Sequence, residues 1–173
     1  MSGASAFRRE TGTNGVLVVT LDVPGEKVNT LGRGLIAEFE RLLSEVEKDE
    51  SVRAIVIRSG KPDSFIAGAD ISEFGSGAPS GASLLDVQDT MENCSKPVVA
   101  AIHSVVMGGG LELALACHYR VVSSGTLVAL PEVKLGLLPG GGGTQRLPRV
   151  LPFELALNMI VQGFPVPSEK LKG

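Results

Sequence analysis

The chain has 173 residues, of which 43% are apolar and 20% are charged, so it is long enough to bury one sizeable core. Its net charge of −3, with no run of Lys or Arg, gives no electrostatic footprint for a nucleic acid or an anionic membrane surface. No apolar stretch reaches the roughly 18 residues of a membrane span, and the first ten residues lack the apolar run of a signal peptide.

The first half of the chain alternates predicted strands with a predicted helix. Residues 16–23 form a β-branched and leucine-rich run that ends at Pro24-Gly25, which predicts a strand closed by a turn. Short apolar runs at 53–59 and 98–102 are typical of buried strands. Between the runs at 16–23 and 53–59, apolar residues recur at helical spacing and predict an amphipathic helix: Leu35, Ile36, Phe39, Leu42, Leu43 and Val46. This alternation predicts an α/β fold.

Small residues interrupt the pattern at 75–81, where we expect a mobile loop that leads into a helix over 82–92. A domain boundary is the alternative, but apolar periodicity resumes at once, so we expect one domain over 1–173. Pro165 and Pro167 predict that the last helix does not continue beyond Val161. The two cysteines, Cys94 and Cys117, have no disulfide-framework or metal-ligand spacing, which indicates reduced thiols inside a cell.

Residues 65–70, Phe-Ile-Ala-Gly-Ala-Asp, are the first of three segments that can carry chemistry. Their small side chains let a ligand approach the backbone, whose N–H groups can then donate hydrogen bonds. The alternative is a simple strand-to-helix turn in which Asp70 is the N-cap.

The second segment, 106–117, is a triple glycine that runs into a strong helix former. A helix that begins there points free N–H groups and a positive dipole end at an anion, as an oxyanion hole requires. Glu112 falls in the first turn, where complementing the dipole is its simplest role. Its apolar neighbours indicate partial burial and a raised pKa.

The third segment, 130–146, places Glu132 among apolar residues before the four glycines 140–143. A solvated glutamate, or an ion pair with Lys134 or Arg146, is the alternative to a functional role. His103 and His118 are expected to be structural, and their number and spacing do not predict a metal site. The sequence contains no GxSxG elbow, so it does not predict a serine or cysteine nucleophile.

Together the three segments resemble the crotonase (enoyl-CoA hydratase/isomerase) superfamily. The shared motifs are Ala67-Gly68-Ala69-Asp70, Gly108-Gly109-Gly110-Leu111-Glu112, and Pro131-Glu132 to Gly136, in the same order and spacing. The runs ALACHYR at 114–120 and PGGGGTQRLPR at 139–149 are most similar to the hydratase domain of multifunctional fatty-acid oxidation α subunits. The resemblance extends over roughly residues 16–163.

The resemblance implies the crotonase (ClpP/crotonase-like) spiral of ββα repeats with flanking helices, and roles for individual residues. The amides of Ala69 and Gly109 would form the oxyanion hole. Glu112 would activate a water molecule and Glu132 would supply a proton. The coenzyme A moiety would lie along a strip whose residues in this sequence are Lys27, Val28, Asn29, Leu31, Ala67, Gly68, Asp70 and Ile71, with Lys27 as a phosphate partner.

The sequence departs from the family pattern in three places. Ser104 stands where these proteins usually have Gly, and Gly141 stands where many carry Ala. Neither difference is expected to touch a catalytic position. The sequence stops at Gly173, before the C-terminal helices that support a trimer or hexamer or cover the active site, and it lacks the dehydrogenase domain of the α subunits, so residues 1–173 are expected to be a truncated crotonase core.

The activity implied is hydration of trans-2-enoyl-CoA in fatty acid β-oxidation, with the CoA thioester as substrate and no metal or redox cofactor. Δ3,Δ2-enoyl-CoA isomerisation, which needs chiefly the Glu132 carboxylate, is the nearest alternative. A non-catalytic acyl-CoA-binding or assembly module is the alternative from another class. Bacterial cytoplasm is the expected location, with a mitochondrion or peroxisome as alternatives, and no nucleic acid partner is expected.

Overall fold

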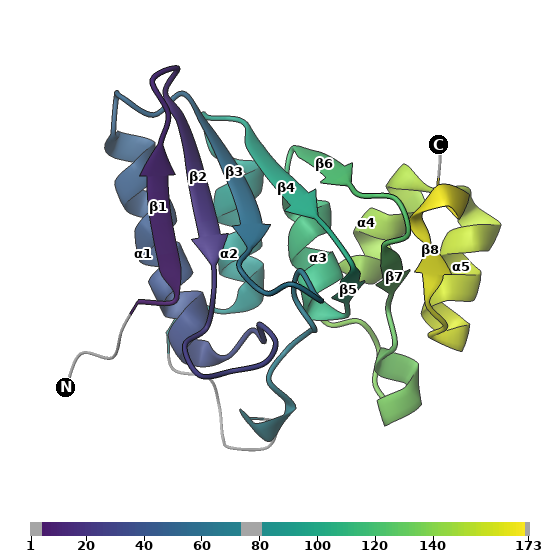
Figure 1. Ribbon diagram of the computed structural model, residues 1–173. Coiled ribbons are helices and arrows are strands. Elements are labelled where there is room, and N and C mark those ends of the chain that lie inside the picture. The colour runs from purple at the N-terminus through teal and green to yellow at the C-terminus, as the bar shows by residue number, and fades with distance from the viewer. Residues whose placement is uncertain (1–4, 74–80, 172–173) are drawn as a thin grey trace.

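The structure, a computed structural model, describes residues 5–73 and 81–171. Within these residues the strands form a five-stranded and a three-stranded sheet (Figure 1). The strands are β1 (Phe7–Thr11), β2 (Val16–Leu21), β3 (Ala54–Ser59), β4 (Val98–Ile102), β5 (Val105–Met107), β6 (Tyr119–Val122), β7 (Leu127–Ala129) and β8 (Val166–Pro167). The α-helices are α1 (Arg33–Lys48), α2 (Leu84–Glu92), α3 (Gly109–Ala116), α4 (Gly143–Val150) and α5 (Phe153–Gln162). Short 3-10 helices are η1 (Ile71–Glu73), η2 (Glu132–Leu135) and η3 (Ser168–Lys170).

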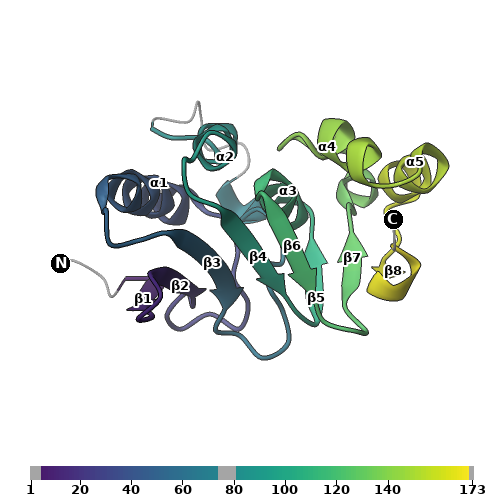
Figure 2. The ribbon, with the colours of Figure 1, turned by 90° about the horizontal axis from the view of Figure 1, so that it is seen from above.

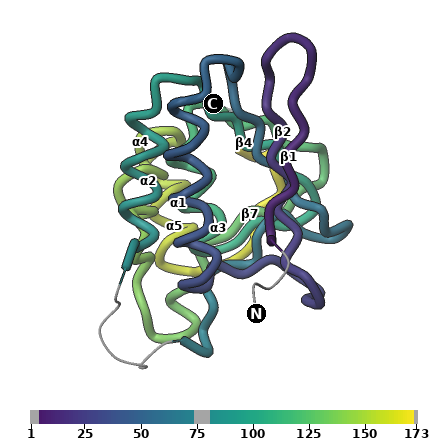
Figure 3. Tube along the Cα trace, turned by 90° about the vertical axis from the view of Figure 1, so that its left-hand side faces the viewer, coloured from purple at the N-terminus to yellow at the C-terminus, as the bar shows by residue number. Residues whose placement is uncertain are grey.

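The larger sheet has the order β1-β2-β3-β4-β6. β1 is antiparallel to β2, and the remaining neighbours are parallel and joined through helices. Seen from above, α1, α2 and α3 lie on one face of this sheet (Figure 2). The view in Figure 3 separates the helices from the strands in the same way. The predicted α/β alternation is therefore confirmed.

Strands β3 and β4 of the larger sheet are buried on one face only, which differs from the expectation for 53–59 and 98–102. In β3 the side chains of Ile55 and Ile57 are buried, whereas Val56 is partly exposed and Arg58 is exposed. β4 alternates in the same way. The reason is that the helices cover one face of the sheet and leave the other accessible.

The predicted helices begin close to where the sequence indicates. α1 buries Leu35, Phe39, Leu42, Leu43 and Val46, the apolar face that the spacing predicts. α2 begins at Leu84 and not at residue 82, because Ser83 and Asp86 form a capping box that defines its first turn.

The smaller sheet pairs β5 in parallel with β7, and β7 antiparallel with β8. The last helix, α5, ends at Gln162, one residue later than predicted, with Gly163 in the left-handed conformation as its C-cap. Residues 75–80 of the predicted loop lie outside the described residues. No helix in 5–73 or 81–171 is long and apolar enough to cross a membrane.

Candidate active site

Three segments that are far apart in the sequence lie side by side where the two sheets meet. The Met107 amide donates to the carbonyl oxygen of Ile66 at 3.1 Å, so 65–69 runs alongside β5. On its other side, the Leu31 amide donates to the carbonyl oxygen of Gly68 at 2.8 Å. The backbone of 66–69 is therefore held from both sides.

The triple glycine brings the start of α3 against this backbone. Gly108 has φ +51°, a conformation that favours glycine. A Cβ on Gly110 would lie 2.6 Å from the Cβ of Ile66, so a side chain cannot fit there. A Cβ on Gly109 would lie 3.5 Å from the amide nitrogen of Ala69. Gly108 and Gly110 are thus required for the close approach of the two backbones, whereas a Cβ on Gly109 would make only ordinary contacts.

The amides of Ala69 and Gly109 are adjacent, and each is left without a hydrogen-bond acceptor from the described residues. Gly109 is the first residue of α3, so its N–H has no partner inside the helix. The neighbouring amides of Ala67 and Asp70 are used, by the carbonyl oxygens of Asn29 and Leu31. The structure therefore presents two free donors at a helix N-terminus, as an oxyanion hole needs.

Asp70 acts as an N-cap. This is the role that the sequence offers as the alternative to ligand binding by residues 65–70. Its Oδ1 accepts hydrogen bonds from the amide of Ser72 at 3.0 Å and from the Ser72 hydroxyl at 2.7 Å. These two bonds lower the pKa of Asp70. Asp70 thus stabilises the first turn of η1.

Glu112 is almost completely enclosed, with 2% of its surface exposed. Its Oε1 accepts a hydrogen bond of 2.8 Å from the amide of Gly143, at the start of α4. Burial raises the pKa of Glu112, against the opposing effects of the Gly143 and Gly141 amides and the charge of Arg146. The expectation of burial and a raised pKa is confirmed.

Gly141 does touch this carboxylate, so the expectation that its departure from the family pattern is remote from catalytic positions is wrong. A Cβ on Gly141 would lie 2.7 Å from Oε2 of Glu112 and 2.9 Å from Leu84. The sequence could not reveal this contact because the glycine loop and α3 are brought together only in the folded chain.

Glu132 begins η2 and is not a solvated loop residue. Its Oε2 is buried and has no hydrogen-bond partner among the described residues. Burial raises the pKa of Glu132, its own backbone amide partly opposes this, and the charge of Glu112 raises it further. The cations considered as partners are engaged elsewhere: Lys134 lies 4.4 Å from the ring centre of Phe164, and Arg146 pairs with Glu92 at 2.7 Å.

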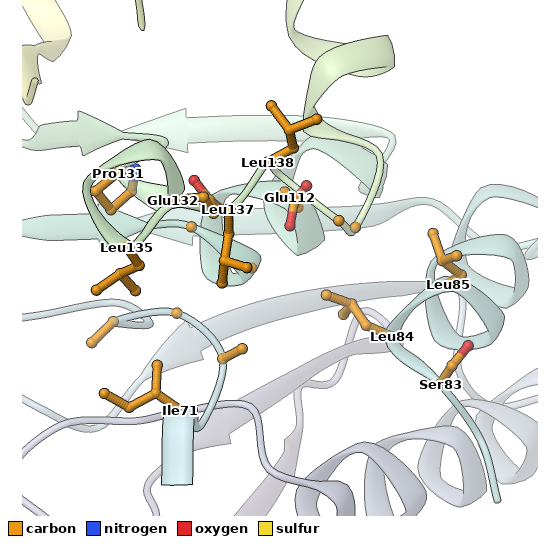
Figure 4. A pocket seen from close by; sticks show the side chains of 17 residues that line it. Ile71, Ser83, Leu84, Leu85, Glu112, Pro131, Glu132, Leu135, Leu137 and Leu138 are labelled. Atoms are coloured by element: carbon orange, nitrogen blue, oxygen red, sulfur yellow. The ribbon is translucent and has the colours of Figure 1, made fainter. Parts of the chain in front are cut away.

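Both carboxylates and both free amides line one cavity of about 470 Å³ (Figure 4). The remaining lining is mostly apolar, and Figure 4 shows Leu137 and Leu138 near the two glutamates and Ile71 and Leu84 across from them. The lining residues are Ala67, Gly68, Ala69, Ile71, Ser83, Leu84, Leu85, Gly108, Gly109, Glu112, Pro131, Glu132, Leu135, Leu137, Leu138, Gly140 and Gly141.

The apolar side chains of this lining were not found by sequence reasoning. Leu84 and Leu85 come from the first turn of α2, and Leu135, Leu137 and Leu138 come from the segment after Glu132. A signal existed, since a run of leucines between Gly136 and Pro139 is unusual for a solvated loop. The leucines still gave no indication of which cavity they face.

The predicted coenzyme A strip is divided by the structure. Ala67, Gly68 and Ile71 line the cavity, whereas Lys27, Val28, Asn29, Leu31 and Asp70 do not. Lys27 and Val28 are exposed on the connection between β2 and α1, and Leu31 is buried beside Ala69.

The side chain of Asn29 is fully buried and hydrogen-bonded within the protein, and the place of this residue in the coenzyme A strip stays a prediction. Its Nδ2 donates to the carbonyl oxygen of Leu21 at 3.0 Å, to the Ser59 hydroxyl at 2.9 Å and to the carbonyl oxygen of Phe65 at 3.2 Å. Its Oδ1 accepts from the amide of Val23 at 3.0 Å. Asn29 therefore holds the strip in place from within.

The histidines and cysteines have structural surroundings. His103 Nε2 lies 2.7 Å from the carbonyl oxygen of Lys61, and His118 Nδ1 accepts from the amide of Val98 at 3.1 Å. Cys94 and Cys117 are unpaired, and burial raises the pKa of Cys117 to about 12. Within the described residues no group of three His, Cys, Asp or Glu is placed to hold a metal ion.

This geometry defines what the site can do chemically. Two amides at a helix N-terminus can polarise a carbonyl oxygen and stabilise the negative charge that develops on it. Two carboxyl groups with raised pKa can exchange protons with carbon or water near that carbonyl. The apolar walls suit a ligand with a hydrocarbon part.

Comparisons with known proteins point in the same direction. The sequence model of the enoyl-CoA hydratase/isomerase family matches residues 11–172. The fatty acid oxidation complex subunit alpha of Shewanella oneidensis is 49% identical over 174 residues, covering 95% of this chain and 24% of that protein. The subunit of the same name from Idiomarina loihiensis is 48% identical, covering 94% of this chain and 24% of that protein. The chain thus spans about a quarter of the length of these curated relatives.

Solved structures share the fold over nearly the whole chain. The enoyl-CoA hydratase from Bacillus anthracis superimposes with a TM-score of 0.87 at 27% identity, covering 96% of this chain and 66% of that one. The enoyl-CoA hydratase from Mycobacterium smegmatis also has a TM-score of 0.87, at 26% identity, covering 98% of this chain and 67% of that one.

Proposed function

Because the chain belongs to the enoyl-CoA hydratase/isomerase family, we propose that it adds water to trans-2-enoyl-CoA thioesters to give 3-hydroxyacyl-CoA. The observation that supports this activity most directly is that Glu112 and Glu132 line one cavity together with the free amides of Ala69 and Gly109. The reaction class needs this set of groups and no others from the protein. We propose that no metal or redox cofactor takes part.

In this proposal the thioester carbonyl oxygen accepts hydrogen bonds from the amides of Ala69 and Gly109. The two donors stabilise the enolate-like charge that forms when C3 is attacked, because they are already oriented and partly shielded from water. They also withdraw electrons from the double bond, which makes C3 electrophilic. The positive end of α3 adds to this effect.

The two carboxyl groups then complete the addition. Ionised Glu112 accepts a proton from the water whose oxygen bonds to C3, and neutral Glu132 donates a proton to C2. Both reach the same face of the double bond in a shared cavity, which gives syn addition. The double bond is consumed, one water is added, and the total charge of the pair is unchanged.

Isomerisation of 3-enoyl-CoA to 2-enoyl-CoA is a second candidate activity. The unpartnered Oε2 of Glu132 favours it, because one carboxylate can remove a proton from one carbon and return it to another. Glu112 is not needed for this transfer. The two activities therefore differ in their dependence on Glu112.

The test follows the loss of the conjugated thioester absorbance of crotonyl-CoA. We expect Glu112→Gln and Glu132→Gln each to lower kcat by about 10²-fold or more, the usual range for removal of a general acid or base. Glu154→Gln, which changes an exposed carboxylate in the first turn of α5, is the matched control and should keep full activity. Hydration that survives in both cavity variants would refute the two-carboxylate assignment.

Two further substrates separate the alternatives. Turnover of a 3-enoyl-CoA that survives Glu112→Gln but not Glu132→Gln would identify the isomerase. A non-reactive saturated acyl-CoA that binds without turnover of either enoyl-CoA would identify an acyl-CoA-binding module. We further propose a bacterial cytoplasmic location and, for the longer protein, a homo-oligomer such as a trimer or hexamer, which sedimentation of that protein would test.

A further inference from the structure

Arg146, a residue of α4 that does not line the cavity, holds two consecutive carbonyl groups of the glycine loop 140–143. Its Nη1 donates a hydrogen bond to the carbonyl oxygen of Gly141 at 3.0 Å. Its backbone amide donates to the carbonyl oxygen of Gly142 at 2.9 Å. Both carbonyls of this part of the loop are thereby directed toward Arg146.

The N–H of the peptide group that joins Gly142 to Gly143 points away from its carbonyl and reaches Glu112. This amide of Gly143 donates to Oε1 of Glu112 at 2.8 Å, and a Cβ built on Gly141 would lie 2.7 Å from Oε2. The loop is therefore enclosed between the guanidinium of Arg146 on one side and the carboxylate of Glu112 on the other. A shift of Arg146 would move the groups that fix the carboxylate.

Gly142 shows how closely the guanidinium packs on the loop. Its φ of +83° favours glycine, and a Cβ built on it would overlap Nη1 of Arg146. The loop thus needs a residue without a side chain at 142 for the clamp to form. The left-handed backbone alone already favours glycine at 142, and the atoms within 4 Å of a built Cβ all belong to Arg146.

The guanidinium is itself held in a fixed orientation. Its Nε and Nη2 donate to the two carboxylate oxygens of Glu92 at 2.7 and 3.0 Å, the paired geometry that arginine forms best. Gln88, which is fully buried in α2, lies within 3.4 Å of Nη1. Helix α2 therefore anchors Arg146, and Arg146 anchors the loop.

We propose that Arg146 is a positioning residue for the reaction, which clamps the glycine loop so that Glu112 is held in the geometry needed to accept a proton from water. This inference rests on the proposed function, because the reaction that Arg146 would assist is the proposed hydration. Arg146 would act on the chemical step and not on substrate binding, because it does not line the cavity.

The charges around Glu112 give this role a signature that a purely structural contact lacks. Glu112 is faced by Arg146 from α4 and by Glu132 from η2. Arg146 in turn is faced by Glu92 and Asp89 from α2, and the charge of His118 acts on Glu92. Since the Arg146 charge lowers the pKa of Glu112, loss of that charge should raise this pKa further above its usual value.

The experiment compares Arg146→Gln and Arg146→Lys with Arg149→Gln in the full chain. Arg149 is the matched control because it is exposed on the same helix and donates only to the carbonyl oxygen of Gln145. For Arg146→Gln we expect kcat for crotonyl-CoA to fall by about tenfold or more, as for a misplaced catalytic group, with KM changed less than about twofold. Arg149→Gln should match the parent protein.

A carbon-13 NMR titration of the Glu112 carboxyl in the free protein supplies a second readout that needs no turnover. Its signal is assigned by its loss in Glu112→Gln. The pKa of Glu112 should rise in Arg146→Gln and stay near the parent value in Arg146→Lys, which keeps the charge but not the paired geometry. In Arg146→Lys kcat should remain reduced.

Several outcomes would overturn the inference. An unchanged kcat and Glu112 pKa in Arg146→Gln would do so, as would a rise in KM at constant kcat. If Arg146→Gln does not fold, Glu92→Gln replaces it, because this change at a half-exposed position weakens the contact that orients Arg146. Glu92→Gln should lower kcat without raising KM. A kcat equal to that of the parent protein in Glu92→Gln would refute the clamp. Lack of turnover by the parent protein would refute the proposed function instead, and the titration would still test the clamp.

Discussion

Glycines at 141 and 143 allow a carboxylate to be enclosed without losing its hydrogen bonds. A Cβ on Gly143 would lie 3.0 Å from Oε1 of Glu112, and one on Gly141 would lie 2.7 Å from Oε2. Ordinary contacts of a Cβ are longer, so each side chain would force the carboxylate to move. The loop thus contributes backbone amides to Glu112 at a distance that only glycine permits.

Gly141→Ala should therefore disturb Glu112 directly. We expect kcat for enoyl-CoA hydration to fall by about tenfold, since displacement of a general base by a fraction of an ångström weakens proton transfer. Gly140→Ala is the control in the same loop, because a Cβ there meets nothing within 4 Å. Steady-state kinetics of the two variants measure the effect, and equal kcat values would show that the loop absorbs the methyl group.

The pKa of the Glu132 carboxyl group is raised in the folded chain, and this shift makes the stability of the fold depend on pH. A group whose folded pKa lies above its unfolded value stabilises the fold below the unfolded pKa, and this stability is lost as pH rises through the folded pKa. Above the unfolded pKa this group therefore opposes folding, because burial with an unpartnered Oε2 disfavours its ionised form.

Glu132→Gln should accordingly be more stable than the parent protein at pH 8, at the expense of activity. We expect a gain of about 1 kcal/mol or less in the free energy of unfolding, because the group is only partly buried and solvent screens it. The gain should disappear near pH 4, where the parent carboxyl is also neutral. Urea unfolding at both pH values measures it, and a gain that is equal at both would contradict this origin.

The short helix α3 is held at both of its ends. At the N-terminus it presents the free amide of Gly109 and the carboxylate of Glu112. At the C-terminus Nη1 of Arg120 donates to the carbonyl oxygens of Ala114, Leu115 and Cys117, at 2.8 to 3.3 Å. A cation at this end also complements the helix dipole. The element that carries the site is thus fixed in spite of its length.

The turn between β4 and β5 carries strain at the position where the sequence departs from the family's glycine. Ser104 has φ +57°, in the left-handed region, where a Cβ costs about 1 kcal/mol or more. Its hydroxyl donates to the carbonyl oxygen of Pro62 at 3.1 Å, which offsets part of this cost.

Ser104→Gly and Ser104→Ala separate these two effects. Both lose the hydroxyl, but only the glycine variant removes the strain. We expect Ser104→Gly to be more stable than Ser104→Ala by about 1 kcal/mol, measured as the free energy of unfolding in urea. Equal stabilities would mean that the backbone relaxes at this turn.

At the scale of the whole molecule, Asn29 connects segments that the chain order keeps apart. Its side chain joins the end of β2, the end of β3 and the backbone that leads to the oxyanion amides. All of these groups are buried, and removal of the amide would leave the carbonyl of Phe65 without this donor, whereas the Leu21 carbonyl keeps the amide of Gly60 and the Ser59 hydroxyl keeps the amide of Lys61.

Asn29→Ala should destabilise the whole fold. We expect a loss of about 3 kcal/mol, since four hydrogen bonds are removed and the carbonyl of Phe65 and the amide of Val23 lose their partner. Asn14→Ala is the control, because its exposed side chain only accepts one bond from the amide of Val16 and should cost less than about 1 kcal/mol. Denaturant unfolding of both variants tests this, and a small effect of Asn29→Ala would show that water replaces the amide.

The α/β alternation and the principal elements could be predicted from the sequence because their signals are local, whereas the crotonase-type fold was implied by the resemblance of three motifs to that family. The apolar spacing of α1 and the β-branched runs of β2, β3 and β4 report the period of each element. The triple glycine before Leu111 predicts where α3 begins, since glycine and a strong helix former act over neighbouring residues.

The tertiary structure alone decided which of these residues meet. Glu112 and Glu132 belong to different elements, and the pairing of β5 with β7 brings them to one cavity. A sequence pattern indicates that a residue is buried but not what lies opposite it, which is why sequence reasoning places Gly141 away from the catalytic positions. The partners of a buried polar group depend on long-range packing, and that packing is a property of the whole folded chain.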